Sequence, residues 1–248
     1  MSMKFAAALL LLVAQDEPRF FDPAVHEATR TFAYEDFRIV PVRVHRLRCK
    51  DAAALDCNLE EADVRRVFEK ANRIWNKAGL ALAIESITRE DAVQGPEFED
   101  SKLDSYKATR PEATRPAGMI HVYYVHELPT NGVFMGRDAI FVKDTAALRK
   151  VRGGVDEPLP RVTSHEIGHA MGLPHRQNTI NLMASGTTGW SVSDDEIDAV
   201  REWAAQQAWV LSPAAALEKG YCDLLSSLPG ESPVKEQARA ALEKSKRR

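Results

Sequence analysis

The pattern of apolar positions in the first third of the chain predicts a strand, a helix and a second strand. Over Phe37–Leu47, apolar residues alternate with polar residues or proline, which is typical of a strand with one buried face. From Val64 to Ala78, apolar residues recur every three or four positions and predict a helix that begins after Asn58 and that Gly79 ends. Alternation resumes over Leu80–Thr88. Because a helix between two strands at this spacing forms a crossover, we expect the strands to be parallel neighbours.

The middle of the chain predicts three more strands. Met119–His126 has apolar or aromatic residues on both faces, and Ala139–Val142 is a short apolar run. Between them, Asn131–Gly136 is bounded by turn residues and is expected as a short edge strand. The polar stretch before these strands is expected to contain a short helix at Phe98–Lys107.

Pairs of residues three apart predict where two of the helices begin. Asn58 with Glu61 is a plausible capping pair for the first helix. Ser193 with Glu196 is a capping box that should open a second helix, running to about Ala208 with its apolar residues on one side.

The histidines in the predicted strands are expected to be ordinary polar residues and not ligands. His45 alternates to the polar side of the first strand, which favours a surface position. His121 and His126 are likewise expected as polar strand residues. Pro41 lacks a backbone N–H, so we expect a bulge or an unpaired side of the first strand there.

A further helix is expected from Arg161 or Val162 to Gly172. Glycine accepts the left-handed conformation that ends a helix, and Pro174 discourages its continuation. The residues expected on its buried face are Val162, Ile167, Ala170 and Met171.

Composition and charge are those of an ordinary soluble globular protein. The 248 residues suit one sizeable domain with extensions, or two small ones, and 44% are hydrophobic and 28% charged. A net charge of −3 gives no electrostatic basis for binding nucleic acid. No stretch is long and apolar enough to be a transmembrane helix. We therefore expect neither nucleic acid nor a membrane as a partner.

The N-terminus resembles an export signal. Lys4 is followed by an apolar run, Phe5–Ala14, which is too short to span a bilayer but fits the apolar region of a signal peptide cleaved near Ala14 or Gln15. We expect residues 1–15 to be this signal peptide and the protein to be secreted or periplasmic. The other reading is a disordered or packed N-terminal segment.

Four residues of the expected helix and the turn after it carry the candidate chemistry. His165 and His169 are four apart, so both imidazoles lie on one face of a helix. After the helix ends, the chain can turn back and present His175 as a third ligand. Three histidines leave one position of a tetrahedral zinc ion for water, as in catalytic zinc sites. Glu166 can reach that water as a general base.

The run His165–His175 resembles the extended motif of the metzincin clan of zinc metalloproteases, and it is matrixin-like. The clan motif is His-Glu-x-x-His-x-x-Gly-x-x-His, followed by a methionine turn that Asn181-Leu182-Met183 can supply. The resemblance covers about Phe37–Trp209. It implies an α+β fold: a twisted mixed sheet of about five mostly parallel strands with one antiparallel edge strand, an active-site helix, a backing helix and a C-terminal helix.

The resemblance also assigns residues around the zinc. Met183 would pack beneath the imidazoles without binding metal, and the segment 184–192 would line the pocket for the side chain after the cut bond, with Trp190 as an apolar wall. Some clan members carry a tyrosine two residues after the methionine, but this chain has Ser185. We also expect the edge-strand residues Val133, Phe134 and Met135 to hold an extended peptide substrate.

The three cysteines allow two readings. Cys49 and Cys57 enclose a short loop, and an exported protein could bridge them, which would leave Cys222 unpaired. In the other reading, Cys49 is a thiolate that blocks zinc in a latent precursor, as in some relatives of the clan. The residues around Cys49 lack the fuller motif of such switches.

These observations together predict an exported zinc-dependent endopeptidase in which Glu166 assists the attack of a zinc-bound water on a peptide bond. The expected limits are a signal peptide at 1–15, an N-terminal extension or short pro-segment at 16–36, a catalytic domain at 37–210 and a helical tail at 211–248. A peptide or protein is the expected substrate, the chain is expected to be a monomer, and structural calcium stays open. The alternatives are a secreted non-catalytic zinc-binding module and a zinc hydrolase of another bond.

Overall fold

The computed structural model describes residues 28, 30–93, 98–136, 139–226 and 233–247. The expected signal peptide at 1–15 and residues 16–27 of the expected extension lie outside this part of the chain, so both stay predictions. Within the described residues, no helix is both long and apolar enough to cross a lipid bilayer.

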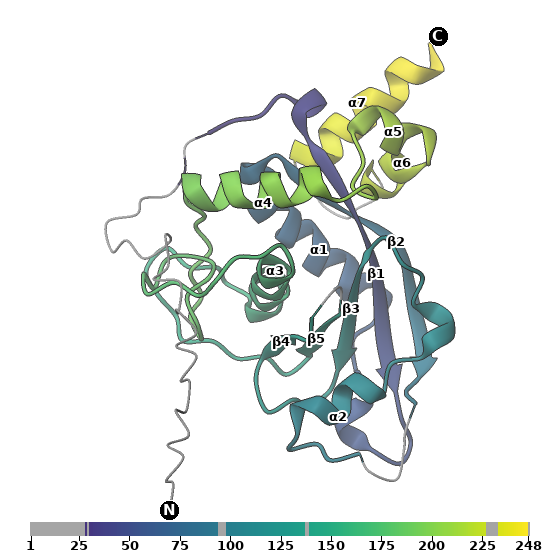
Figure 1. Cartoon of the computed structure of the whole chain (residues 1–248), viewed down its shortest axis with the longest axis vertical. Helices are drawn as coiled ribbons and strands as arrows, with labels where there is room; N and C mark the ends of the chain where they lie inside the picture. The colour runs from purple at the N-terminus through teal and green to yellow at the C-terminus, as the bar shows by residue number, and fades with distance from the viewer. Residues whose placement is uncertain (1–27, 29, 94–97, 137–138, 227–232, 248) are drawn as a thin grey trace, which may run out of the picture.

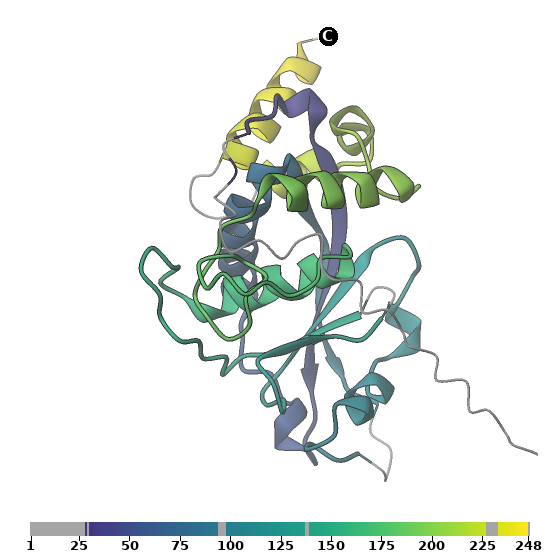
Figure 2. The ribbon, with the colours of Figure 1, turned by 60° about the vertical axis from the view of Figure 1, so that its left-hand side comes forward.

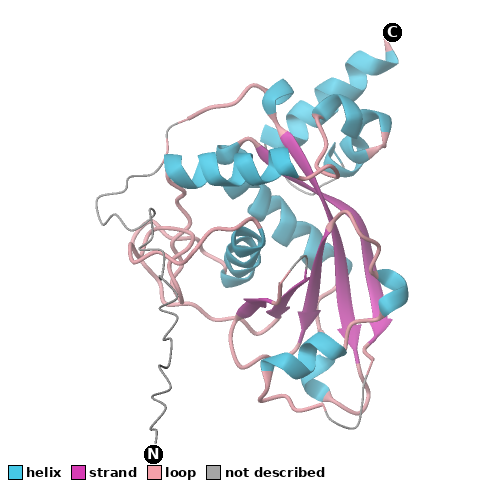
Figure 3. Cartoon of the chain, viewed as in Figure 1, coloured by secondary structure: helices cyan, strands magenta, loops and turns pink. Residues whose placement is uncertain are grey.

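Five strands of the described chain form one twisted mixed sheet with the spatial order β2-β1-β3-β5-β4 (Figures 1 and 3). The first four are parallel to their neighbours, and β4 is antiparallel to β5 at one edge. The strands are β1 (Arg38–Arg48), β2 (Leu80–Asp91), β3 (Ile120–Val125), β4 (Gly132–Phe134) and β5 (Ala139–Lys143). The expected α+β class and the antiparallel edge strand are confirmed.

Helices cover the sheet and extend beyond one end of it. Those of the described residues are α1 (Glu61–Trp75), α2 (Leu103–Ala108), α3 (Pro158–Ala170), α4 (Asp194–Gln206), α5 (Pro213–Glu218), α6 (Tyr221–Ser226) and α7 (Pro233–Lys246), with single 3-10 turns at η1 (Tyr34–Asp36), η2 (Ala53–Leu55), η3 (Asn76–Ala78) and η4 (Glu112–Thr114). Figures 1 and 2 show α2 near the end of the sheet opposite to α4, and the C-terminal helices grouped beyond α4.

The expected crossover is present, because β1 and β2 are parallel neighbours joined through α1. Gly79 adopts a left-handed conformation with a φ of 64° and ends η3 after the helix. The expected cap is wrong: Glu60, not Asn58, is the N-cap of α1 and forms a capping box with Asp63. Asn58 lies before the helix, and its side chain contacts His126 at 2.8 Å. The bulge in β1 lies just after Pro41, between Val42 and Arg43.

The two faces of the sheet have separate cores. The alternating valines of β1 join α1 and α3 in the main buried cluster. The opposite face carries a smaller cluster in which Tyr106 of α2 meets Tyr123 and Phe141 of the strands. Helices α5–α7 add Ala216, Cys222, Leu225, Val234 and Ala238 to the main cluster.

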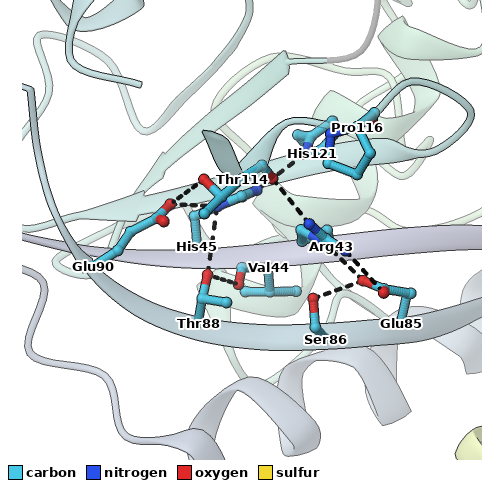
Figure 4. A network of polar contacts seen from close by, with 10 residues as sticks. All are labelled: Arg43, Val44, His45, Glu85, Ser86, Thr88, Glu90, Thr114, Pro116 and His121. Atoms are coloured by element: carbon cyan, nitrogen blue, oxygen red, sulfur yellow. Dashed lines mark hydrogen bonds and ion pairs between the residues drawn. The ribbon is translucent and has the colours of Figure 1, made fainter. Parts of the chain in front are cut away.

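The expectation that His45 lies at the surface is wrong: it is fully buried on the second face, where it belongs to the polar network drawn in Figure 4. Its Nδ1 lies 2.6 Å from a carboxylate oxygen of Glu90, and its Nε2 lies 2.9 Å from Nδ1 of His121. His121, which is also buried, contacts the carbonyl of Pro116 at 2.9 Å through Nε2. The two histidines therefore form a buried polar chain between β2 and the segment that covers this face.

The expected bridge between Cys49 and Cys57 is wrong for the described structure, which holds no disulfide between them. Cys57 is buried in the main cluster, and its sulfur accepts a hydrogen bond from the backbone N–H of Leu59 at 3.4 Å. Cys49 packs against the second cluster, on the other face of the sheet. The two sulfurs therefore belong to different cores.

Candidate functional site

Helix α3 carries the candidate chemistry, and it begins earlier than expected. It starts at Pro158 and not at Arg161 or Val162. Proline is suited to the first turn of a helix, because its missing N–H has no partner to lose there. The helix ends at Ala170, and Gly172 has a φ of 89°, which allows the chain to reverse direction.

Three histidines converge at the C-terminal end of α3. Nε2 of His169 lies 3.1 Å from Nε2 of His165 and 3.1 Å from Nε2 of His175. All three candidate ligand atoms lie within 4.8 Å of one another. Ligands about 2.1 Å from one tetrahedral ion lie roughly 3.4 Å apart, so the spacing of this cluster suits one zinc ion.

Hydrogen bonds on the other side of two rings fix which nitrogen faces the cluster. Nδ1 of His165 donates to the carbonyl of Leu182 at 2.8 Å, and Nδ1 of His169 donates to the carbonyl of Leu173 at 2.7 Å. Because a carbonyl only accepts, each Nδ1 carries the hydrogen, and each neutral ring turns an Nε2 lone pair toward the cluster. Burial lowers the pKa of His165 to about 3, which favours the neutral ring.

Lone pairs that face one another at hydrogen-bond distance repel unless a cation lies between them. The arrangement of the His165 and His169 rings therefore suits a metal ion better than a hydrogen bond between the rings, and His175 lies where it could supply a third ligand atom. Of the predicted residues, His165, His169 and His175 are all brought together.

The loop after His175 packs against α3, the helix that carries His165 and His169. Met183 is fully buried, and a Cβ added to Gly168 of α3 would lie only 2.6 Å from its sulfur. Asn181 accepts a hydrogen bond from the N–H of Met183 at 2.6 Å and donates one to Glu196 of α4 at 2.8 Å. Glu196 also pairs with Arg176 at 2.8 Å, which ties the chain beside His175 to the same helix. The sequence predicted the capping role of Glu196 but not this network.

Glu166 lies between α3 and the edge strand. It is 5% exposed, and burial raises its pKa to about 7, while Arg161 and a backbone hydrogen bond from Phe134 lower it. A Cβ added to Gly132 would lie 2.8 Å from Cγ of Glu166, so β4 passes in direct contact with this side chain. The carboxylate is thus held at the edge of the sheet, beside the histidines.

Two pockets adjoin the histidines and Glu166. The first is bordered by Gly132, Val133 and Phe134 of β4 and by the turn after α3. The second is lined by Thr130, Asn131, Gly132, Leu148, Arg161, Val162, His165, Glu166, His175, Ser185 and Gly186.

Two of the expected substrate-binding residues have other partners. Met135 borders neither pocket: its side chain packs against the second cluster, and its N–H donates to the carbonyl of Ala139 at 2.9 Å. Trp190 also lies outside both linings: its indole N–H donates to the carbonyl of Gly153 at 2.9 Å, and Lys77 stacks on its ring.

Comparisons with known proteins give one related sequence. No protein-family model matches the chain. The chain is 27% identical over 188 residues to interstitial collagenase of Sus scrofa, which covers 70% of this chain and 36% of the collagenase. The chain therefore spans little more than a third of the length of that relative.

Comparison with solved structures gives weak matches. Metalloproteinase-II from Bacteroides fragilis matches with a TM-score of 0.45 and 15% identity, over 75% of this chain and 59% of that chain. A chaperone-substrate complex matches with a TM-score of 0.45 and 10% identity, over 71% of this chain and 35% of that chain. With the histidine cluster in place, the collagenase relative supports the metzincin-like resemblance that the sequence motif predicted.

Proposed function

We propose that this protein is a zinc-dependent endopeptidase. The observation that carries the proposal is the convergence of three Nε2 atoms, two of them fixed by Nδ1 hydrogen bonds to carbonyls. His165, His169 and His175 would hold the ion as neutral imidazoles. A bound zinc ion would supply Lewis acidity, which activates water and polarises a carbonyl.

Glu166 is the proposed general base and acid. One of its carboxylate oxygens takes a proton from the attacking water as the oxygen of that water bonds to the peptide carbonyl carbon. The same carboxyl group then passes the proton to the nitrogen as the C–N bond breaks. Its contact with the edge strand keeps the carboxylate near a substrate bound there.

The edge strand is the proposed docking site of the substrate backbone. Lys143 donates to Asn131 and Met135 donates to Ala139, and hydrogen-bonded pairs alternate along an antiparallel ladder. The main-chain groups of Gly132 and Phe134 therefore point away from β5. There the N–H of Phe134 bonds to Glu166 and the carbonyl of Gly132 accepts from the hydroxyl of Thr130 at 2.8 Å. An extended peptide could pair with the N–H of Gly132 and the carbonyl of Phe134, which favours a peptide substrate over another hydrolysable bond.

Proteolysis can be tested directly with a chelator. The purified protein should cleave an unfolded casein-type substrate, lose this activity after treatment with a zinc chelator, and recover it on addition of zinc. A protein that binds zinc but never cleaves such a substrate would instead be a non-catalytic zinc module.

Replacing Gly132 with alanine should impair catalysis without removing the metal. The new methyl group would lie 2.7 Å from Cγ1 of Val162 and 2.8 Å from Cγ of Glu166, so the carboxylate must move. Because misplacement by about 1 Å can cost a factor of about 100, we expect kcat to fall roughly 10- to 100-fold. Steady-state kinetics and zinc analysis of the same preparation measure both effects. An unchanged kcat would mean that β4 does not position Glu166.

A further inference from the structure

The second pocket beside the histidines contains a buried positive charge. The pocket measures about 350 Å³, which is near the lower limit for small ligand sites and suits one side chain. Arg161 borders it from α3 and is only 1% exposed. Arg161 precedes His165 by four residues, so its backbone lies about one helical turn, roughly 6 Å, nearer the N-terminus of α3 than that of His165.

The guanidinium of Arg161 is held by neutral groups. Its Nε donates to the carbonyl of Gly189 at 3.0 Å, and one Nη donates to the carbonyl of Ala184. Within the described residues, no carboxylate lies in ion-pair contact with Arg161. Burial lowers its pKa to about 10, so the group is still a cation at neutral pH.

Glu166 acts on this charge only from beyond ion-pair distance, and carbonyl dipoles do not neutralise a cation, so the buried charge of Arg161 is only partly compensated. A guanidinium has five N–H donors, and the two hydrogen bonds to the loop use only part of them. A carboxylate is the group whose charge and geometry match the remaining donors.

We propose that Arg161 makes this pocket selective for an acidic side chain of the substrate. The inference rests on the proposed proteolysis and adds a substrate class, peptides with Glu or Asp directly after the cut bond. The side chain of that residue is the one that the 184–192 loop is expected to receive. Glutamate suits the pocket better than aspartate, because the carboxylate must reach past Glu166 to the level of Arg161, one turn farther along α3.

Glu166 is the competing charge, because its carboxylate borders the same pocket. Repulsion between it and a substrate carboxylate opposes binding, and the longer reach of glutamate reduces this repulsion by increasing the separation. Replacing Glu166 with glutamine should therefore strengthen the preference for an acidic peptide.

Two peptides that differ by a single group test the selectivity without altering the protein. A cleavage profile on a peptide library first identifies a cut site, and a matched pair is then made with Glu or Gln after the cut. We expect kcat/KM to be at least about tenfold higher for the Glu peptide, as a charge-assisted hydrogen bond would give. Arg161→Met should bring this ratio close to one, whereas Arg152→Met, which removes an exposed charge from the nearby connector, should leave it unchanged.

Binding of the same two peptides to the Glu166→Gln protein separates this inference from the proposed activity and needs no Arg161 variant. We expect the Glu peptide to bind at least about tenfold more tightly than the Gln peptide. Cleavage of both peptides with equal kcat/KM, or equal binding of both, would overturn the role of Arg161. Preferential binding of the Glu peptide by a protein that never cleaves it would support the pocket and contradict the proteolysis.

Discussion

The Glu166→Gln protein should lose nearly all peptide hydrolysis, with kcat reduced by about 10³-fold, while it still binds zinc. Glutamine has nearly the shape of glutamate but cannot accept and return a proton, and general acid–base groups contribute about 10²–10⁴-fold to rates. The side chain is 5% exposed and packs against β4, so an isosteric replacement should fit the same space. Cleavage kinetics with zinc analysis on the same sample measure the effect.

A matched variant controls for the loss of a negative charge. Glu202 is an exposed residue of α4, and Glu202→Gln should leave kcat unchanged. If Glu166→Gln retained the activity of the Glu202→Gln protein, the proton would have to be moved by another group, and the proposed role of Glu166 would be wrong.

The Gly189→Ala protein should unfold about 6–12 °C lower than the wild type. A Cβ there would lie 2.3 Å from the carbonyl oxygen of Thr179 and 2.5 Å from the carbonyl carbon of Ile180, and both are backbone atoms that cannot rotate away. Overpacking of this kind costs on the order of 3 kcal/mol, and each kcal/mol corresponds to about 2–4 °C for a chain of this size.

The same substitution should also disturb the orientation of the histidines. The loop is closed by hydrogen bonds from Leu182 to Ser191 at 2.7 Å and from Ser191 to Ile180 at 3.0 Å, and the carbonyl of Leu182 orients His165. Zinc affinity should therefore fall together with the melting temperature. Ser185→Ala, an exposed change in the same loop, is the control and should melt as the wild type does. If Gly189→Ala had the melting temperature of the wild type, the loop would not be packed as described.

The sequence predicted the features that depend on neighbouring residues. The β1–α1–β2 crossover follows from local periodicity, and Gly79 and Gly172 end their helices because a left-handed residue is needed there. The spacing of His165 and His169 on one helix face is also local. The convergence of His175 was expected from the motif, and the structure adds the carbonyls that orient the first two rings.

The burial of His45 and of Arg161, which the sequence did not predict, depends on contacts between distant parts of the chain. Alternation along β1 correctly placed His45 opposite the valines, but it cannot reveal that α2 and the segment before Pro116 cover that face as well. Arg161 carries no local signal that distinguishes a buried arginine from a solvated one, because its burial depends on the loop that supplies Gly189.

Zinc content is the most direct test of the three-histidine site. The purified wild-type chain should contain about one zinc ion per chain by elemental analysis after extensive dialysis. His175→Ala should retain far less, because two imidazoles alone hold the ion weakly. His126→Ala, which removes a half-buried histidine bonded to Asp144, should retain the wild-type amount. A wild-type chain that binds no zinc, or a His175→Ala chain that binds as much as the wild type, would contradict the convergence of the three histidines on one metal ion.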